Sequence, residues 1–299
     1  MADLRAAIRT SAARRLLAGG LIALAAAISP AHSDPLRIVA AENVYGDVAR
    51  QIGGAEVKVT SILSNPSQDP HEFEASASTA RALADARLVI YNGAGYDPWA
   101  ARLLTASKPT SREVIEVAGL VHKKAGDNPH LWYDIAAVSA LASTLAKKMS
   151  ELDSAHRDGY AERGAAFEAS MARVREKIAT LRGKHAGTPV TATEPVFDYM
   201  AEALGLRMRN GRFQLAVMNG TEPSAAAIAA FEKDLRTRTV RVLLYNTQTT
   251  HAVAERMRAI AKQAGVPVVA ITETAPQDRS YQAWMLAQLE ELGRALSSR

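Results

Sequence analysis

The chain has 299 residues, of which 48% are apolar and 22% charged, and its formal net charge is +5. These proportions are typical of an ordinary globular protein and exclude a disordered or membrane-embedded chain. The sequence contains no cysteine, which excludes disulfides, zinc–thiolate sites and thiol catalysis. It also leaves no cysteine for a lipid anchor at the mature N-terminus, so we expect a protein that is not lipid-anchored.

Residues 1–33 have the pattern of a secretory signal peptide. An apolar run at residues 16–28 is too short to span a bilayer comfortably, and small residues at Ala31 and Ser33 suit a cleavage site. Basic residues precede the run: Arg5, Arg9, Arg14 and Arg15. Both the general and the twin-arginine export routes remain open. An exported protein without an anchor needs an outer barrier to retain it, so we expect a periplasmic location.

Removal of the predicted signal peptide lowers the formal net charge to about +2, because it takes away four arginines and one aspartate. A nearly neutral mature protein gives no reason to expect nucleic acid as a partner.

Strands and helices alternate in the first half of the mature chain. Strands are predicted at residues 36–41, 57–62 and 88–91, and helices at residues 44–52 and 77–86. This alternation favours a parallel sheet with helices on both faces. We therefore expect an N-terminal α/β lobe at residues 34–152.

A long helix is predicted next, because residues 154–181 contain no proline and carry one apolar stripe. The stripe consists of Tyr160, Phe167, Met171, Val174, Ile178 and Leu181. A coiled-coil dimer is an alternative, but a single helix of this length is short for one, so we expect a monomer. We assign residues 153–185 to this linking helix.

Strands and helices alternate again in residues 186–299, which we expect to form the C-terminal lobe. Strands are predicted at residues 190–193, 240–245 and 266–272, and helices at residues 197–204, 224–235, 252–264 and 281–296. The predicted fold class is therefore α/β, with two lobes, each a mainly parallel sheet flanked by helices, joined by one long rigid helix.

Two Pro-His loops are the first candidates for binding chemistry. They are Asp69-Pro70-His71-Glu72 and Asn128-Pro129-His130-Leu131-Trp132. A histidine in a loop at the carboxyl end of a parallel strand lies where α/β proteins place ligands. Each histidine taken alone is better explained as a surface or capping residue. Two matching loops in one lobe favour metal binding.

Two glutamates at predicted strand ends, Glu194 and Glu273, are the second pair of candidates. Each one alone is better explained as an acid at the start of a helix, where the helix dipole favours negative charge. Two imidazoles with two carboxylates, however, make a suitable site for Mn²⁺, Fe²⁺ or Zn²⁺.

The two Pro-His loops and the two glutamates, taken in their order along the chain, resemble the zinc- and manganese-binding solute receptors of ATP-driven importers. The resemblance covers residues 36–299 and includes Glu222-Pro223-Ser224 and the tail Glu273-Thr274-Ala275-Pro276. It implies one divalent ion as cargo, a membrane permease and a separate ATPase as partners. A metallochaperone as an additional partner is left open.

The resemblance also implies the ligands. The first two family histidines fall on His71 and His130, the third ligand on Glu194 and the fourth on Glu273, with Asp278 as the fallback. Manganese-type members carry glutamate at the third position and zinc-type members histidine. The long histidine-rich loop of many zinc receptors is absent, and only His122 stands in its place. A role for His251 near the site is left open.

Two other classes of function compete with transport. A hydrolytic zinc usually has three protein ligands and an open position for water, whereas four protein ligands leave the metal largely closed. We therefore expect no enzymatic activity. A metal-scavenging surface protein or adhesin is the other alternative, but a purely adhesive or structural role would leave a buried ligand set without a purpose.

Overall fold

The computed structural model of the chain describes residues 34–107 and 111–298. The predicted signal peptide lies outside these described residues. From Pro35 onward the chain forms one unit. No helix within the described ranges combines the length and apolar character that crossing a membrane requires.

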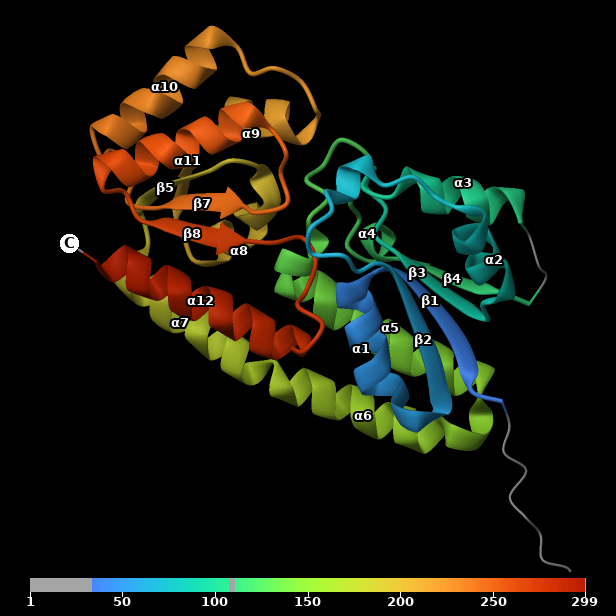
Figure 1. The fold of residues 1–299 in the computed structure, drawn as a ribbon. Coiled ribbons are helices and arrows are strands. Elements are labelled where there is room, and N and C mark those ends of the chain that lie inside the picture. Colours follow the sequence, from blue (N-terminus) through green and yellow to red (C-terminus); the bar gives the residue numbers. More distant parts are fainter. Residues whose placement is uncertain (1–33, 108–110, 299) are drawn as a thin grey trace, which may run out of the picture. The chain divides into compact units, whose positions relative to one another are not determined.

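The first sheet contains four parallel strands in the order β2-β1-β3-β4. They are β1 (Leu36–Glu42), β2 (Val57–Leu63), β3 (Leu88–Tyr91) and β4 (Glu113–Glu116). β1 is buried at every position except Arg37, as expected for a central strand covered on both faces. Its helices are α1 (Asn43–Gly53), α2 (Ala77–Asp85), α3 (Pro98–Ala106), α4 (Val117–Leu120) and α5 (Ile135–Leu152), shown in Figure 1.

The predicted long helix occurs as two consecutive helices, α6 (Arg157–Ser170) and α7 (Ala172–His185), after a short 3₁₀ turn at Ser154–His156. They meet at Met171, whose N–H lies 3.2 Å from the carbonyl oxygens of both Phe167 and Glu168. The Met171 carbonyl accepts from the N–H of Arg175 at 3.0 Å, so the helical ladder continues through the break. The break is a single tightened turn at Met171. The predicted long helix between the lobes is therefore present.

The second sheet repeats the order of the first, as β6-β5-β7-β8, again with parallel pairing. Its strands are β5 (Pro189–Ala192), β6 (Arg207–Arg209), β7 (Leu243–Asn246) and β8 (Val268–Ile271). Its helices are α8 (Asp198–Ala203), α9 (Gly211–Met218), α10 (Ala225–Arg236), α11 (Ala252–Ala264) and α12 (Tyr281–Ser297). The predicted fold class is confirmed, whereas the lobe boundaries at residues 152 and 185 stay a prediction.

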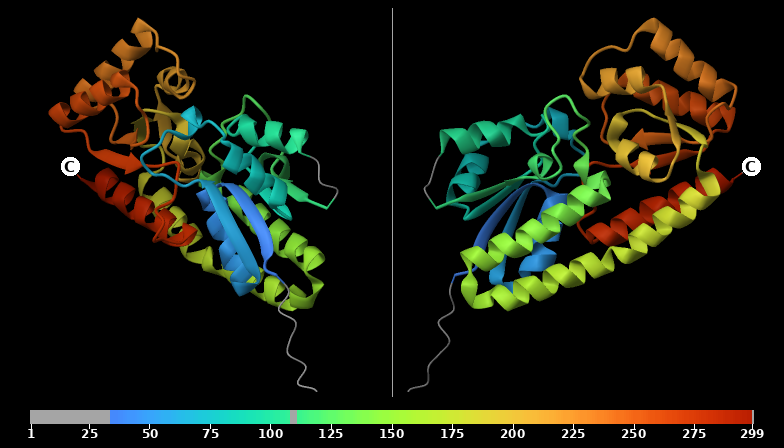
Figure 2. Two further views of the ribbon diagram at one scale, coloured as in Figure 1. Left: turned by 45° about the vertical axis from the view of Figure 1, so that its right-hand side comes forward. Right: turned by 180° about the vertical axis from the view of Figure 1, so that it is seen from behind.

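One apolar core is shared by both lobes. It extends from the first sheet through α6 and α7 to buried residues of the second sheet, including Leu244 and Ile271. Figure 2 shows α12 alongside α7. Hydrogen bonds also join the two lobes. The Tyr281 hydroxyl donates to the Trp132 carbonyl, and the Tyr133 hydroxyl donates to the Thr272 carbonyl, both at 2.8 Å. A shared core and a helical link together resist large hinge motion.

Candidate metal-binding site

His71 follows β2 and lies in a short 3₁₀ turn, Pro70–Glu72. Proline suits the first position of such a turn because that residue's N–H would have no partner there. The Asp69 side chain caps the turn, with its Oδ1 accepting from the N–H of His71 at 2.9 Å. The sequence Asp-Pro-His therefore fixes the backbone that carries the imidazole.

His130 immediately precedes another 3₁₀ turn, Leu131–Tyr133, and is fully buried. Oδ1 of Asn128 lies 2.7 Å from Nδ1 of its ring and accepts from its backbone N–H at 3.1 Å. The Asn128 side-chain amide donates to the Pro195 carbonyl at 2.7 Å, so its oxygen is the acceptor. Nδ1 of His130 consequently carries the proton, and Nε2 presents its lone pair, which is the tautomer that binds metal.

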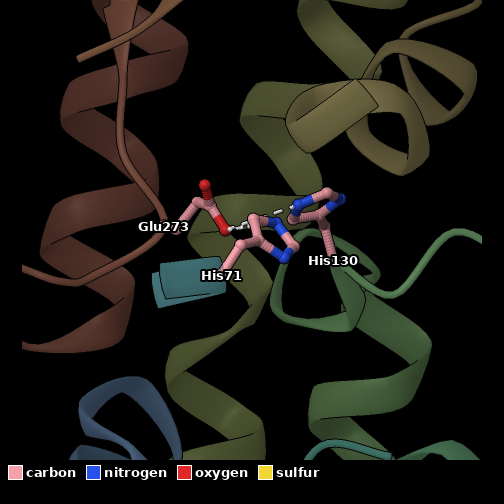
Figure 3. A group of neighbouring side chains, drawn as sticks. All are labelled: His71, His130 and Glu273. Carbon is pink, nitrogen blue, oxygen red and sulfur yellow. Dashed lines mark ion pairs between the residues drawn. The ribbon is translucent and has the colours of Figure 1, made fainter. Parts of the chain in front are cut away.

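Glu273 follows β8 and brings its carboxylate to both imidazoles, as Figure 3 shows. Its Oε2 lies 3.5 Å from Nε2 of His130 and 3.6 Å from Nε2 of His71. The ligand atoms of the three residues all lie within 4.8 Å of one another. The structure therefore brings together three of the four residues predicted from the sequence.

Glu194 follows β5 and precedes the 3₁₀ turn Pro195–Phe197, and only 2% of its surface is exposed. Glu194 is not one of the three residues whose ligand atoms lie within 4.8 Å of one another. The fallback Asp278 is exposed and lies outside the group as well. His122 is exposed and His251 is half-buried at the start of α11, and neither belongs to the group.

Three of the four candidate ligands each have a buried polar atom with no hydrogen-bond partner among the described residues. They are Nε2 of His71, Nε2 of His130 and Oε1 of Glu194, all buried. A buried polar atom without a partner is costly, and native proteins satisfy nearly all of them. Each of these atoms can donate a lone pair to a cation, so the donor set fits a divalent metal ion.

The electrostatics of the four side chains differ. Burial raises the pKa of Glu194 to about 8, and the charges of Glu273 and Asp69 add to the effect. Burial also lowers the pKa of His130, which favours the neutral, metal-binding ring. For Glu273, the effect of burial is outweighed, when the two imidazoles are protonated, by their contacts and charges, and by the hydrogen bond from the Tyr96 hydroxyl, so its pKa is lowered to about 2. Glu273 is therefore ionised at neutral pH, while Glu194 is mostly protonated.

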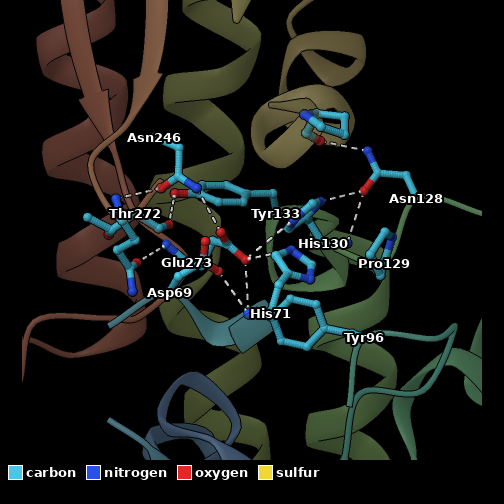
Figure 4. Close-up of polar contacts among 12 residues, drawn as sticks. Asp69, His71, Tyr96, Asn128, Pro129, His130, Tyr133, Asn246, Thr272 and Glu273 are labelled. Atoms are coloured by element: carbon cyan, nitrogen blue, oxygen red, sulfur yellow. Dashed lines mark hydrogen bonds and ion pairs between the residues drawn. The ribbon is translucent and has the colours of Figure 1, made fainter. Parts of the chain in front are cut away.

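The residues that hold Glu273 were missed in the sequence. Asn246, the last residue of β7, donates from Nδ2 to Oε1 of Glu273 at 2.8 Å. The Tyr96 hydroxyl donates to Oε2 at 2.8 Å (Figure 4). Oε1 of Gln248 accepts from the N–H of Glu273 at 2.7 Å, and its Nε2 donates to the Gln68 carbonyl at 2.8 Å. Asn246 was detectable as a polar residue at the carboxyl end of a parallel strand.

Gln248 links the segment before His71 to the segment that carries Glu273, and it is only 3% exposed. The two histidines come from the first lobe and Glu273 from the second. The three side chains of the group therefore come from segments that follow both sheets.

The family described as zinc-uptake complex component A, periplasmic (ZnuA) matches residues 38–295. The metal ABC transporter substrate-binding lipoprotein SloC of Streptococcus mutans is 24% identical over 286 residues, covering 88% of this chain and 90% of that protein. The manganese ABC transporter substrate-binding lipoprotein PsaA of Streptococcus pneumoniae is 24% identical over 306 residues, covering 94% and 96%. The resemblance stated from the sequence is confirmed.

Among solved structures, the periplasmic zinc-binding protein TroA from Treponema pallidum superposes with a TM-score of 0.73 at 18% identity, over 88% of this chain and 100% of that one. This likeness concerns the fold.

One expectation is contradicted by the comparisons. The relatives SloC and PsaA are both named lipoproteins. We had inferred a protein that is not lipid-anchored from the lack of cysteine alone, and the names of these relatives contradict that inference. The absence of one residue type was too narrow a basis for a statement about anchoring.

Proposed function

The chain belongs to the ZnuA family of periplasmic zinc-uptake components, and from this premise we propose that it captures one divalent transition-metal ion and delivers it to an ABC importer. The ion is bound by His71, His130, Glu194 and Glu273, two ligands from each lobe. The ion is the protein's cargo and takes no part in a reaction.

The observation that carries this proposal is the convergence of unpartnered lone pairs in one buried place. Nε2 of His71 and Nε2 of His130 face Oε2 of Glu273 at 3.6 and 3.5 Å and have no hydrogen-bond partner. Oε1 of Glu194 is likewise buried without a partner. Its raised pKa follows from burial and from the charges of Glu273 and Asp69. A cation binding here relieves that repulsion, so Glu194 loses its proton and becomes the fourth ligand.

We propose Mn²⁺ as the first choice of cargo, with Zn²⁺ as the alternative and Fe²⁺ also compatible with the donor set. Two carboxylates that each bind through two oxygens would give six-coordination, which suits Mn²⁺ or Fe²⁺. Binding through one oxygen each would give the tetrahedron that Zn²⁺ prefers. Raw affinity follows the usual order of divalent metals and favours Zn²⁺ in any such site. Zinc in a purified sample therefore does not identify the cargo.

The cellular setting follows the same proposal. Residues 1–33 act as a signal peptide, and the mature protein works in the periplasm as a monomer. Its partners are a membrane permease and the separate ATPase of the importer, and delivery of the ion by a metallochaperone is left open. The protein has no enzymatic activity, because four protein ligands leave no open metal position for a water nucleophile.

Isothermal titration of metal-free protein, residues 34–299, tests the metal proposal. We expect one ion per chain for Mn²⁺ and for Zn²⁺, with tighter binding of Zn²⁺. His71→Ala should abolish tight binding, whereas the matched control His156→Ala, a half-exposed histidine near the start of α6, should bind as the parent does. Equal binding by the His71 and His156 variants would overturn the proposal.

N-terminal sequencing of the exported protein tests the location. A mature N-terminus near Asp34 is expected. An intact Met1 in exported protein would contradict the signal-peptide assignment.

A further inference from the structure

Two carboxyl groups lie side by side in the interior of the first lobe, outside the predicted ligand set. Glu42 is the last residue of β1 and is 2% exposed, and Asp97 immediately precedes α3 and is 1% exposed. β1 pairs with β3 in a parallel register that sets Ala40 opposite Ile90, so Glu42 stands beside Asn92, the residue whose N–H donates to Asp97. The two carboxyl groups are therefore close enough for each to affect the charge of the other. Neither forms an ion pair with any described residue. Two buried acids close together without a cation need an explanation.

Asp97 has the contacts of an ionised carboxylate. Its Oδ2 accepts from the N–H of Asn92 at 2.6 Å and its Oδ1 from the N–H of Gly93 at 2.9 Å. Backbone donors stabilise the charged form of an acid. Both oxygens of Asp97 thus serve as acceptors and hold the loop of residues 92–97 in a closed turn.

Glu42 has the opposite character. Neither of its carboxyl oxygens receives a hydrogen bond from a described donor. Burial raises its pKa well above the usual range, and the charge of Asp97 adds to this effect. The other ionisable groups facing the pair are tyrosines: Tyr45 from α1, Tyr91 from the end of β3 and Tyr96 from the loop. Two adjacent buried carboxyls are strongly disfavoured from ionising together, because each charge raises the pKa of the other.

The loop held by Asp97 contacts the metal site at two points. Nδ2 of Asn92 donates to the carbonyl of Pro129 at 2.8 Å, directly before His130. The Tyr45 hydroxyl donates to Oδ1 of Asn92, which fixes the orientation of that amide. The Tyr96 hydroxyl, one residue before Asp97, donates to Oε2 of Glu273 at 2.8 Å. One loop therefore supports a ligand from each lobe.

We propose that Glu42 and Asp97 share one proton and act as positioning residues for the metal site, by holding the loop of residues 92–97 against His130 and Glu273. The proposal rests on the proposed function for the identity of the ligand. The proton donated by Glu42 keeps both acids compatible with burial while Asp97 keeps both backbone contacts. Groups that contact a ligand directly, as Tyr96 contacts Glu273, orient it, and their loss typically lowers metal affinity by about 10–100-fold. Glu42 and Asp97 act on the ligands through the loop that carries Tyr96 and Asn92.

Three variants of the full mature chain separate the shared proton from the positioning of the loop. Glu42→Gln retains a donor toward Asp97 and nearly the same volume. Glu42→Leu retains volume but has no donor. Asp97→Asn replaces one of the two acceptor oxygens by a donor. Asp234→Asn is the matched control, since Asp234 is also a buried acid, 6% exposed, but is bound to Arg209 in the second lobe.

Mn²⁺ affinity is measured by chelator competition, and unfolding is followed in parallel for each metal-free variant. We expect Glu42→Gln to bind within about threefold of the parent, and Glu42→Leu and Asp97→Asn to bind at least about tenfold more weakly. Asp234→Asn should lose stability without losing affinity. Parental affinity in both Glu42→Leu and Asp97→Asn would overturn the positioning role. Equal losses in Glu42→Gln and Glu42→Leu would overturn the shared proton.

A metal-independent readout keeps this test separate from the proposed function. The infrared difference spectrum of parent minus Glu42→Gln should contain the carbonyl stretch of a protonated carboxyl at neutral pH, and its absence would refute the shared proton. If the parent binds no divalent ion, the proposed function fails while the infrared result still decides the protonation of Glu42. If Glu42→Leu does not fold, Asp97→Asn compared with Glu42→Gln decides the positioning role.

Discussion

Metal affinity should rise with pH above neutrality because Glu194 must lose a proton to bind the ion. Burial, with the charges of Glu273 and Asp69, raises the pKa of Glu194 to about 8 in the metal-free protein. About one tenth of this side chain is then ionised at pH 7 and about nine tenths at pH 9. The apparent affinity should therefore increase about tenfold between these values, equivalent to about 1.4 kcal/mol.

The pH range is chosen so that the imidazoles contribute little. An ordinary histidine titrates near pH 6.5, and burial lowers the pKa of His130 further. Mn²⁺ affinity is measured by competition with a chelator of known proton dependence at half-unit steps from pH 7 to 9. In Glu194→Gln the affinity should be lower and nearly independent of pH. Glu202→Gln, at an exposed acid of α8, is the control and should retain the parental slope.

The same shift affects stability, with a sign that can be checked. The pKa of Glu194 is raised on folding, so its contribution to stability is fully present below the ordinary value of 4.5 and is lost as the pH rises through about 8. Metal-free Glu194→Gln should consequently be more stable than the parent at pH 9. A flat affinity profile in the parent, or an unchanged slope in Glu194→Gln, would refute the reasoning about Glu194.

Further predictions concern the ligands and the motion between lobes. His130→Ala should abolish tight Mn²⁺ binding in calorimetry while circular dichroism stays unchanged, because the ring supplies a ligand from a prebuilt turn. Glu273→Ala should also abolish it and Asp278→Ala should not, and the reverse result would mean that the fourth ligand is misplaced. X-ray scattering curves of metal-free and Mn²⁺-bound protein should coincide, because the lobes share a core and the helices α6 and α7. A change of several ångströms in the radius of gyration would contradict that rigidity.

The sequence predicts the buried strands of the fold well but misses two of the four edge strands, β4 and β6. β1 reads as an apolar run because both faces are covered, and α12 as a helix through its apolar periodicity. β4 (Glu113–Glu116) and β6 (Arg207–Arg209) lie at sheet edges, and half or more of their residues are charged. Short exposed strands of this kind lack the pattern that identifies a strand. They form because a neighbouring strand offers hydrogen bonds. Which strand is the neighbour depends on the tertiary structure and cannot be seen in the local sequence.

For the site, the sequence predicts positions but not the contacts between lobes. His71, His130, Glu194 and Glu273 were recognisable from local motifs at strand ends. The contact between Tyr96 and Glu273, however, joins residues 177 positions apart. The pairing of Glu42 with Asp97 depends on the path of the chain between β1 and α3 and has no local signal. Local motifs therefore indicate which residues are candidate ligands, whereas the orientation of each side chain depends on long-range packing.

A crystal structure of the protein soaked with Mn²⁺, with anomalous data collected above and below the manganese absorption edge, tests the central claim most directly. The account predicts one strong anomalous peak per chain, bounded by Nε2 of His71, Nε2 of His130 and carboxylate oxygens of Glu194 and Glu273. Nitrogen and oxygen ligands should lie roughly 2.0–2.3 Å from the peak. A peak elsewhere in the chain, or none among these four side chains, would contradict the account.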